Sequence, residues 1–252
     1  MFARFIRFVC VGLALLAGWM WSLPAWAASP GNLTLKAADG VKVVAQLYKA
    51  DKARAVMLVF HQAGSNKAEY ATIAPLLAQQ GFTVLAIDQR SGGKMFGKDN
   101  ETVKKRGKNG QYMETMADME AALDWGSKQG LPVVVWGSSY SAAMVFLLCA
   151  KHPNSIAAAL AFSPGEYLQP EGAVQQAAAK VTQTLFVTSA MDAEEVAAAQ
   201  KIVDASPSKN KTRFVPKLGG VHGSSTLIAE KNPAGKDENW QAVQTFLRDL
   251  KF

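Results

Sequence analysis

The feature that most constrains the fold is a regular alternation of short apolar runs with longer stretches of helical periodicity. Continuous apolar runs such as residues 55–60 and 82–87 are typical of strands that are buried on both faces of a sheet. Between such runs, hydrophobic residues recur at helical spacing, and Gly81 and Pro153 end two of these stretches. Strands that alternate with helices favour a mostly parallel sheet covered on both faces. The sequence therefore predicts an α/β fold with a doubly wound sheet.

The predicted elements follow one another with little intervening sequence. The strands are expected at residues 33–38, 41–48, 55–60, 82–87, 131–136, 156–162, 184–189 and 213–218. The helices are expected at residues 66–80, 112–129, 141–151, 193–205 and 238–250. Asp39-Gly40 between the first two strands predicts a hairpin turn. The only place for a lid is the short interval 163–183, so we expect one domain over residues 28–252 with a minimal lid.

The first 27 residues have the three parts of a secretory signal peptide. Arg4 and Arg7 precede an apolar run, and the segment closes on Ala25-Trp26-Ala27. We expect cleavage after Ala27, which would make the mature chain periplasmic or secreted and leave it without stable membrane insertion. A retained membrane anchor is the alternative, since the apolar stretch approaches the ~20 residues needed to span a bilayer.

Charge and cysteine content restrict the function classes. The formal net charge is +7, and much of the excess lies in residues 94–108. This basic segment is either a solvated loop or an electropositive rim that attracts anionic substrates. Export and the lack of interleaved aromatic residues argue against nucleic-acid binding. No disulfide can form once Cys10 is removed with the signal peptide. Cys149 is expected to be a buried hydrophobic residue, because it lies in an apolar run.

A candidate nucleophile lies between a predicted strand and a predicted helix. The segment Gly137-Ser138-Ser139-Tyr140-Ser141 has the form G-x-S-x-S, which differs at one position from the G-x-S-x-G nucleophile elbow. The serine of such an elbow occupies a strained turn with no room for bulky neighbours. Ser139 is therefore the expected nucleophile, and the N–H of Tyr140 at the start of the helix is an expected oxyanion donor.

Only three histidines compete for the role of general base. His152 precedes a proline at the end of a helix and is expected to be a helix cap. His61 follows a buried strand. His222 lies in a glycine-rich segment between the last strand and the last helix, after the other triad candidates in the order expected for a Ser, acid, His triad. We therefore expect His222 to be the base.

The acid that orients His222 should follow the strand at residues 184–189. Asp192 stands there, whereas Glu194 and Glu195 fall in the first turn of the next predicted helix, where acidic residues favour the helix dipole in any case. The sequence thus favours Asp192, with Glu194 as the alternative.

Taken together, these motifs resemble the α/β-hydrolase superfamily, and the short lid region resembles its dienelactone-hydrolase-like and small serine esterase branch. The resemblance implies that His61-Gln62-Ala63-Gly64 matches the superfamily's H-G-x-G oxyanion loop, so that the Ala63 N–H would be the second donor. Gln62 departs from this pattern, because glycine is usual there. Ser139 stands where a dienelactone hydrolase proper has cysteine, which argues against a lactone-specific activity.

These residues predict a serine hydrolase that cleaves carboxylic esters or related small acyl compounds through an acyl-enzyme. The expected catalytic residues are Ser139, Asp192 and His222, with Tyr140 and Ala63 at the oxyanion. No cofactor or metal motif is present in the sequence. A peptidase or amidase of the same fold is an alternative, and so is a noncatalytic binding protein of the cell envelope.

Overall fold

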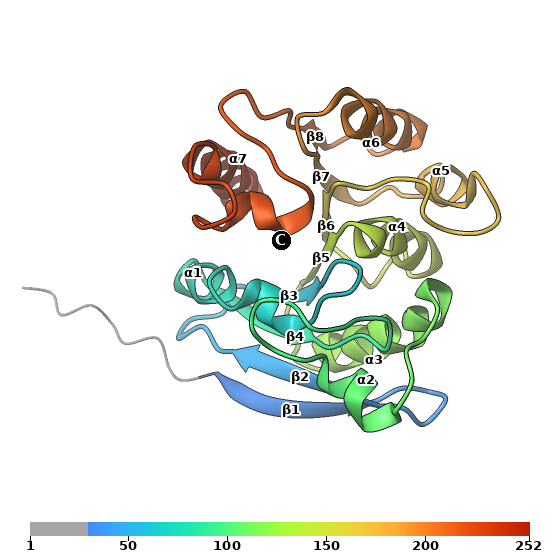
Figure 1. Cartoon of the computed structure of the whole chain (residues 1–252). Coiled ribbons are helices and arrows are strands. Elements are labelled where there is room, and N and C mark those ends of the chain that lie inside the picture. The colour runs from blue at the N-terminus through green and yellow to red at the C-terminus, as the bar shows by residue number, and fades with distance from the viewer. Residues whose placement is uncertain (1–29) are drawn as a thin grey trace, which may run out of the picture.

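The computed structural model describes residues 30–252, so the predicted signal peptide lies outside the described residues. Eight strands form one open sheet in the order β1-β2-β4-β3-β5-β6-β7-β8 (Figure 1). β1 pairs with β2 and β2 with β4 in the antiparallel direction, and all the other pairs are parallel. The strands are β1 Gly31–Lys36, β2 Lys42–Tyr48, β3 Ala55–Phe60, β4 Phe82–Ile87, β5 Val133–Ser138, β6 Ala158–Phe162, β7 Thr184–Thr188 and β8 Lys211–Arg213.

Helices cover both faces of the sheet, which confirms the predicted α/β class (Figure 1). One face packs against α3, α4, α5 and α6, and the other face packs against α1 and α7. The α-helices are α1 Ala74–Gln79, α2 Glu101–Arg106, α3 Met116–Ser127, α4 Tyr140–Lys151, α5 Ala173–Ala178, α6 Ala193–Ala205 and α7 Lys236–Asp249. The 3-10 turns are η1 Lys67–Tyr70, η2 Tyr112–Thr115 and η3 Gly223–Leu227.

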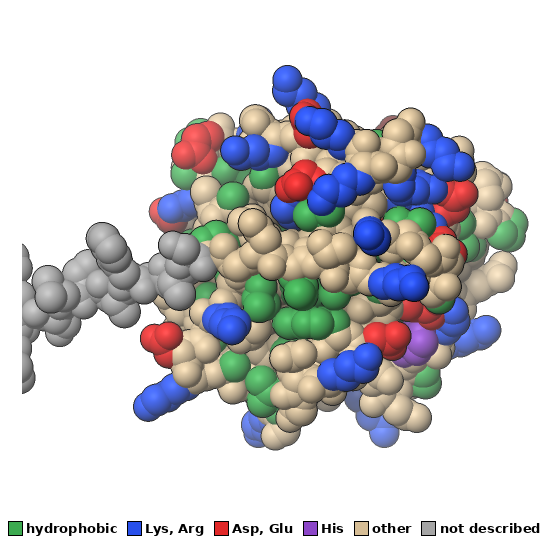
Figure 2. All heavy atoms as spheres, turned by 90° about the horizontal axis from the view of Figure 1, so that it is seen from below, with side chains coloured by type: hydrophobic (Ala, Val, Ile, Leu, Met, Phe, Trp, Pro, Cys, Tyr) green, Lys and Arg blue, Asp and Glu red, His purple; other side chains and the backbone are tan. Residues whose placement is uncertain are grey.

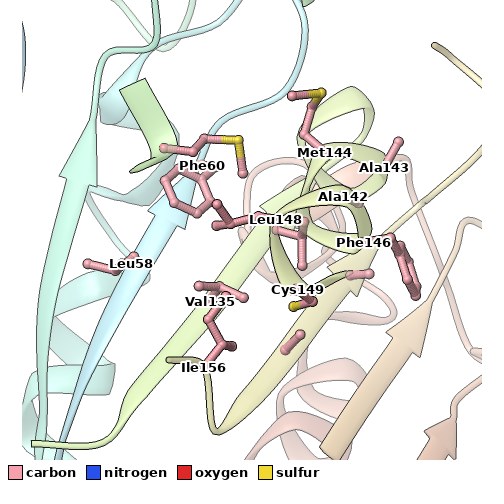
Figure 3. Packing of buried hydrophobic residues seen from close by; sticks show 14 of the residues in the cluster. Leu58, Phe60, Val135, Ala142, Ala143, Met144, Phe146, Leu148, Cys149 and Ile156 are labelled. Atoms are coloured by element: carbon pink, nitrogen blue, oxygen red, sulfur yellow. The ribbon is translucent and has the colours of Figure 1, made fainter. Parts of the chain in front are cut away.

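The apolar run of β3 explains how the core forms on both sides. Val56, Leu58 and Phe60 belong to the cluster under α3 and α4, whereas Met57 and Val59 belong to the cluster under α1 and α7. Because successive strand residues point to opposite faces, a strand between two helical layers must be apolar at every position. Figure 3 shows the α4 side of this core, where Leu148 of α4 lies beside residues of β3 and β5.

The helix predicted over residues 66–80 is divided into η1 and α1. Pro75 stands in the first turn of α1 and has no N–H to donate one turn back, so a single α-helix cannot run through it. The intervening N–H groups bond three residues back instead, from Ala71 to Ala68 and from Ile73 to Tyr70. Asn66 caps η1, since its side chain accepts the Ala68 N–H.

Two further predictions were wrong in detail. The basic segment is not all loop, because α2 forms within it between the N-cap Asn100 and the left-handed Gly107. The last strand comes before Pro216, at Lys211–Arg213, and not at residues 213–218. β8 is a short edge strand held by its pairing with β7, so its sequence carries little of the apolar signal that marks the central strands.

The sheet topology creates one favourable position for a ligand. β3 has β4 on one side and β5 on the other, so the chain order reverses between β3 and β5. Ligands of open α/β sheets bind beyond the carboxyl ends of the strands at such a switch point. The segments that leave the two strands there begin with His61 and with Ser139. Within residues 30–252, no helix is long and apolar enough to cross a membrane.

Candidate active site

Ser139 occupies a strained turn between β5 and α4. Its backbone has φ 60° and ψ −123°, in a region that side chains other than glycine rarely adopt. The Ser139 N–H donates to Phe162 O at 2.8 Å, and its carbonyl accepts the Ala142 N–H at 2.8 Å. A Cβ on Gly137 would lie 2.3 Å from the carbonyl oxygen of Ser141, so this turn requires glycine there. These features are those of a nucleophile elbow.

Ser141 fits where the motif usually has a second glycine. Its buried hydroxyl donates to His61 O at 2.6 Å and lies 3.0 Å from Oε1 of Gln89. The extra hydroxymethyl group therefore has space and partners, and it ties the elbow to the segment after β3.

His222 lies against Ser139, the nucleophile expected from the sequence. Its Nε2 is 2.7 Å from Ser139 Oγ, although the two residues are 83 positions apart. Two hydrogen bonds from backbone N–H groups to serine hydroxyls hold the segment that carries His222: Gly223 N–H donates to Ser163 Oγ at 3.0 Å, and Ser224 N–H donates to Ser138 Oγ at 2.8 Å. The structure thus brings together two residues that the sequence predicted to form one site.

The acid beside His222 is Glu195, and the expectation that Asp192 takes this place was wrong. Glu195 Oε1 lies 2.5 Å from His222 Nδ1. The Asp192 carboxylate instead caps α6 by accepting the Glu195 N–H at 2.9 Å. Glu194, the alternative expected from the sequence, lies exposed in the same first turn. The two acidic residues are one helical turn apart. The side chain of Glu195 points toward His222, whereas that of Asp192 caps the N-terminus of α6.

The hydrogen bonds from Ser139 through His222 to Glu195, here called the Ser–His–Glu chain, shift the pKa of both titratable members. Burial tends to raise the pKa of Glu195, but hydrogen bonds from His222 and from Ser163 outweigh this and lower it. The hydrogen bond to Glu195 raises the pKa of His222 above its usual value, against the opposing effect of burial. The chain therefore joins an ionised acid to an imidazole with increased proton affinity.

In the loop after β3, residues 61–64, hydrogen bonds hold the peptide group between Gln62 and Ala63 in one orientation. The Gln62 carbonyl accepts the Ser65 N–H at 3.2 Å and lies 2.8 Å from His61 Nδ1. Because C=O and N–H point in opposite directions in a trans peptide, these bonds also fix the direction of the Ala63 N–H. Within the described part of the chain, neither this N–H nor that of Tyr140 has a protein acceptor. Both donors predicted for an oxyanion are thus available.

The two other histidines, His61 and His152, make hydrogen bonds to groups other than Ser139. His61 is fully buried, and burial lowers its pKa, so its ring is neutral. Its Nδ1 then donates to Gln62 O while its Nε2 accepts the Gln89 N–H at 3.1 Å. His152 at the end of α4 lies 2.6 Å from Glu120 Oε1, at the end of the helix that is remote from Ser139.

The basic segment contributes to another part of the surface. Lys98, Lys104 and Lys105 line a cavity of about 980 Å³ beside β1 and β2 whose lining includes neither Ser139 nor His222. Lys105 lies 3.9 Å from Glu101, and Lys104 lies 3.7 Å from Asp99. Figure 2, which views the molecule from below relative to Figure 1, shows Lys and Arg side chains over much of this face, with acidic and neutral side chains between them.

With this geometry in place, a family model identifies the chain. The model described as Hydrolase_4, serine aminopeptidase, S33, matches residues 51–218, more than half of the sequence. The chain belongs to this family of α/β-hydrolases. It is therefore an α/β-hydrolase enzyme, and the resemblance seen in its sequence is confirmed. No curated protein gives a significant match.

Solved structures share the fold at low sequence identity. The esterase Pf2001 of Pyrococcus furiosus is 18% identical with a TM-score of 0.63, and the match covers 87% of this chain and 89% of that one. A dienelactone hydrolase from Anabaena variabilis is 16% identical with a TM-score of 0.66, covering 88% and 99% of the two chains. A thermostable carboxyl esterase from Bacillus coagulans is 14% identical with a TM-score of 0.66, covering 87% and 98%.

Sequence reasoning missed two residues of this site besides Glu195. Ser163, which follows β6 with φ 54°, accepts the Gly223 N–H and supports Glu195. Glu69, on η1, is fully buried next to the loop after β3. A glutamate among polar neighbours such as Asn66 and Lys67 in a predicted helix gives no sign of burial, so no local signal could have drawn attention to Glu69.

Proposed function

We propose that this α/β-hydrolase is a serine hydrolase of carboxylic esters or related small acyl compounds, with Ser139 as nucleophile, His222 as general base and Glu195 as the orienting acid. The observation that carries the proposal is the continuous Ser–His–Glu chain, with 2.7 Å from Ser139 Oγ to His222 Nε2 and 2.5 Å from His222 Nδ1 to Glu195 Oε1. These distances are within the reach that proton transfer and orientation of the base require.

The chemistry follows from the roles of these groups. His222 Nε2 takes the hydroxyl proton of Ser139 while Oγ attacks the acyl carbonyl, and the charge of Glu195 stabilises the resulting imidazolium. The N–H groups of Tyr140 and Ala63 bind the oxyanion. His222 then returns the proton to the leaving alcohol. In the second half of the reaction, a water molecule gives a proton to His222 and attacks the acyl carbonyl, and His222 returns that proton to Ser139 as the acid is released.

An ester is the preferred substrate class because the fold is shared with two esterases and a dienelactone hydrolase. The family description, serine aminopeptidase, favours peptide cleavage as a second candidate. An anionic substrate stays a prediction from the basic segment. A loss of kcat/KM with rising salt for an anionic ester, but not for a neutral one, would support it.

A fluorophosphonate probe tests the proposed function directly. We expect stoichiometric labelling of the wild-type protein and none of Ser139→Ala. Ser155→Ala is the matched control, since Ser155 is exposed beyond the far end of α4, and it should label fully. Absence of labelling in folded wild-type protein would favour a noncatalytic binding protein. Rates on an alanine ester and on the corresponding anilide then separate esterase from aminopeptidase activity.

We also propose that the chain is exported and cleaved after Ala27, on the basis of its basic start, apolar run and Ala25-Trp26-Ala27 ending. Expression of the full chain in a Gram-negative host, followed by osmotic shock and N-terminal sequencing, tests this. A new terminus at position 28 in the periplasmic fraction is expected. Recovery of the uncleaved chain in membranes would show the anchor instead.

A further inference from the structure

Glu69 has a carboxyl group in an unusual position for an acidic side chain. It is fully buried on η1, and its Oε2 accepts the Gln62 N–H at 2.8 Å. Within residues 30–252, no hydrogen bond of standard geometry reaches its Oε1, although the hydroxyls of Ser138 and Ser65 lie near enough to the carboxyl to affect its titration. A carboxyl removed from water with so few hydrogen bonds costs free energy, and a neutral side chain could accept the Gln62 N–H equally well. The presence of an acid here therefore points to a role beyond packing.

The carboxyl lies where three segments of the site meet. Gln62 belongs to the loop after β3, and the residue that follows it, Ala63, supplies an N–H proposed to bind the oxyanion. The Ser138 hydroxyl, adjacent in sequence to the nucleophile, faces Glu69 and also accepts the Ser224 N–H at 2.8 Å. Because Ser224 comes two residues after His222, the group around Glu69 joins the oxyanion loop, the nucleophile elbow and the segment that holds the base.

We propose that Glu69 is a positioning residue of this active site, whose carboxylate orients the oxyanion loop through Gln62 and places a buried negative charge beside the segments that carry Ser139 and His222. The proposal rests on the serine-hydrolase function proposed above. Glu69 touches neither the nucleophile nor the acyl group, and it acts on the reaction through Gln62 and His222.

The charges near Glu69 determine how its effect depends on pH. His222 faces it from the segment before η3, and Tyr70 neighbours it on η1 with a hydroxyl that stays neutral. Lys67, on the same turn, is neutralised by Asp88 at 2.8 Å. Burial raises the pKa of Glu69 to about 7, although hydrogen bonds and the charge of His222 oppose this rise. Glu69 is thus ionised above about pH 7, and below it loses the charge-assisted bond to Gln62.

The experiment compares Glu69→Gln, which keeps an acceptor for Gln62 but removes the charge, with Glu69→Asp, which keeps the charge but shortens the reach. We expect Glu69→Gln to lower kcat by about 10-fold with KM within about two-fold, because only the transition state carries the oxyanion and the imidazolium. Glu120→Gln, which removes a carboxylate at the far end of α4, is the matched control and should keep wild-type kcat. Active-site titration with the fluorophosphonate gives turnover per folded site, so misfolding cannot imitate the effect.

The pH profile distinguishes positioning by an ionised group from a purely structural role. Protonated Glu69, like the Glu69→Gln variant, should keep about a tenth of the activity, so log kcat/KM of the wild type should fall with a slope above 1 over about one pH unit and return to a slope of 1 below it. The slope should be 1 in Glu69→Gln and remain above 1 in Glu69→Asp. In NMR titrations, the pKa of His222 should be lower in Glu69→Gln than in the wild type, because the variant loses a negative charge.

Wild-type turnover per labelled site in Glu69→Gln, together with an unchanged acid limb and an unchanged His222 pKa, would overturn the inference. Failure of the wild type to label would refute the proposed function instead, so the two failures can be told apart.

Discussion

Replacing Glu195 with glutamine tests which acid serves His222. The variant keeps the size of the side chain and an oxygen that can accept from Nδ1, but it removes the negative charge next to the imidazole. With charge centres ~4 Å apart and an effective dielectric constant of about 20, the lost interaction is about 4 kcal/mol. His222 is 39% exposed and Glu195 21%, so solvent screening reduces this to about 3 kcal/mol. At about 1.4 kcal/mol per factor of ten, kcat/KM should fall about 10²-fold.

The assay is steady-state hydrolysis of a short aryl ester, with rates normalised to fluorophosphonate-labelled sites. Glu194→Gln is the matched control, since it removes a neighbouring exposed charge from the same turn of α6 and should retain wild-type activity. Asp192→Asn should also stay within about two-fold of the wild type, because asparagine caps a helix as well as aspartate does. The reasoning is refuted if Glu195→Gln keeps more than a tenth of the activity while Asp192→Asn loses about 10²-fold.

The same variant changes the pH dependence in a defined direction. A general base acts in its neutral form, so under the proposed mechanism kcat/KM rises as pH increases through the pKa of His222. The hydrogen bond to Glu195 is the main cause of the raised pKa of His222. The acid limb should therefore lie at lower pH in Glu195→Gln than in the wild type, and an upward shift would contradict the assignment.

Three further predictions concern the framework and the cysteine. Arg90→Met leaves the buried Asp118 carboxylate without the partner that now lies 2.7 Å away, so the free energy of unfolding in urea should fall by about 3–5 kcal/mol; a loss below about 1 kcal/mol would contradict this. Gly137→Ala places a Cβ against the Ser141 carbonyl, so thermal unfolding should show that the free energy of unfolding falls by about 1–3 kcal/mol, and fluorophosphonate labelling should decrease. Wild-type stability and labelling would refute the close approach. Cys149 is buried and burial raises its pKa, so with the other cysteine replaced by serine, a thiol reagent should react only after denaturant is added, and rapid reaction of the native protein would oppose this.

The central part of the fold and the strained turn at Ser139 could be predicted because both depend on local sequence patterns. An apolar run such as Ala55–Phe60 is informative because a strand between two helical layers buries every side chain, and glycine at position 137 is informative because the elbow has no space for a Cβ. The edge strand Lys211–Arg213 could not be predicted in the same way, since it is polar and is defined by pairing with β7. The division of the helix at Pro75 was readable in principle, because proline lacks the N–H that a continuous helix needs there.

The sequence by itself determined that strands and helices alternate, that Ser139 follows a strand, and that His222 comes last in order. Each of these depends on neighbouring residues and on backbone sterics. Tertiary structure alone decided between Asp192 and Glu195, because both lie in one helical turn and only the packing of α6 relative to His222 directs one carboxylate to the imidazole and leaves the other at the helix end. It also decided that Glu69 is buried beside the loop after β3, since burial of a charge depends on segments distant in the chain.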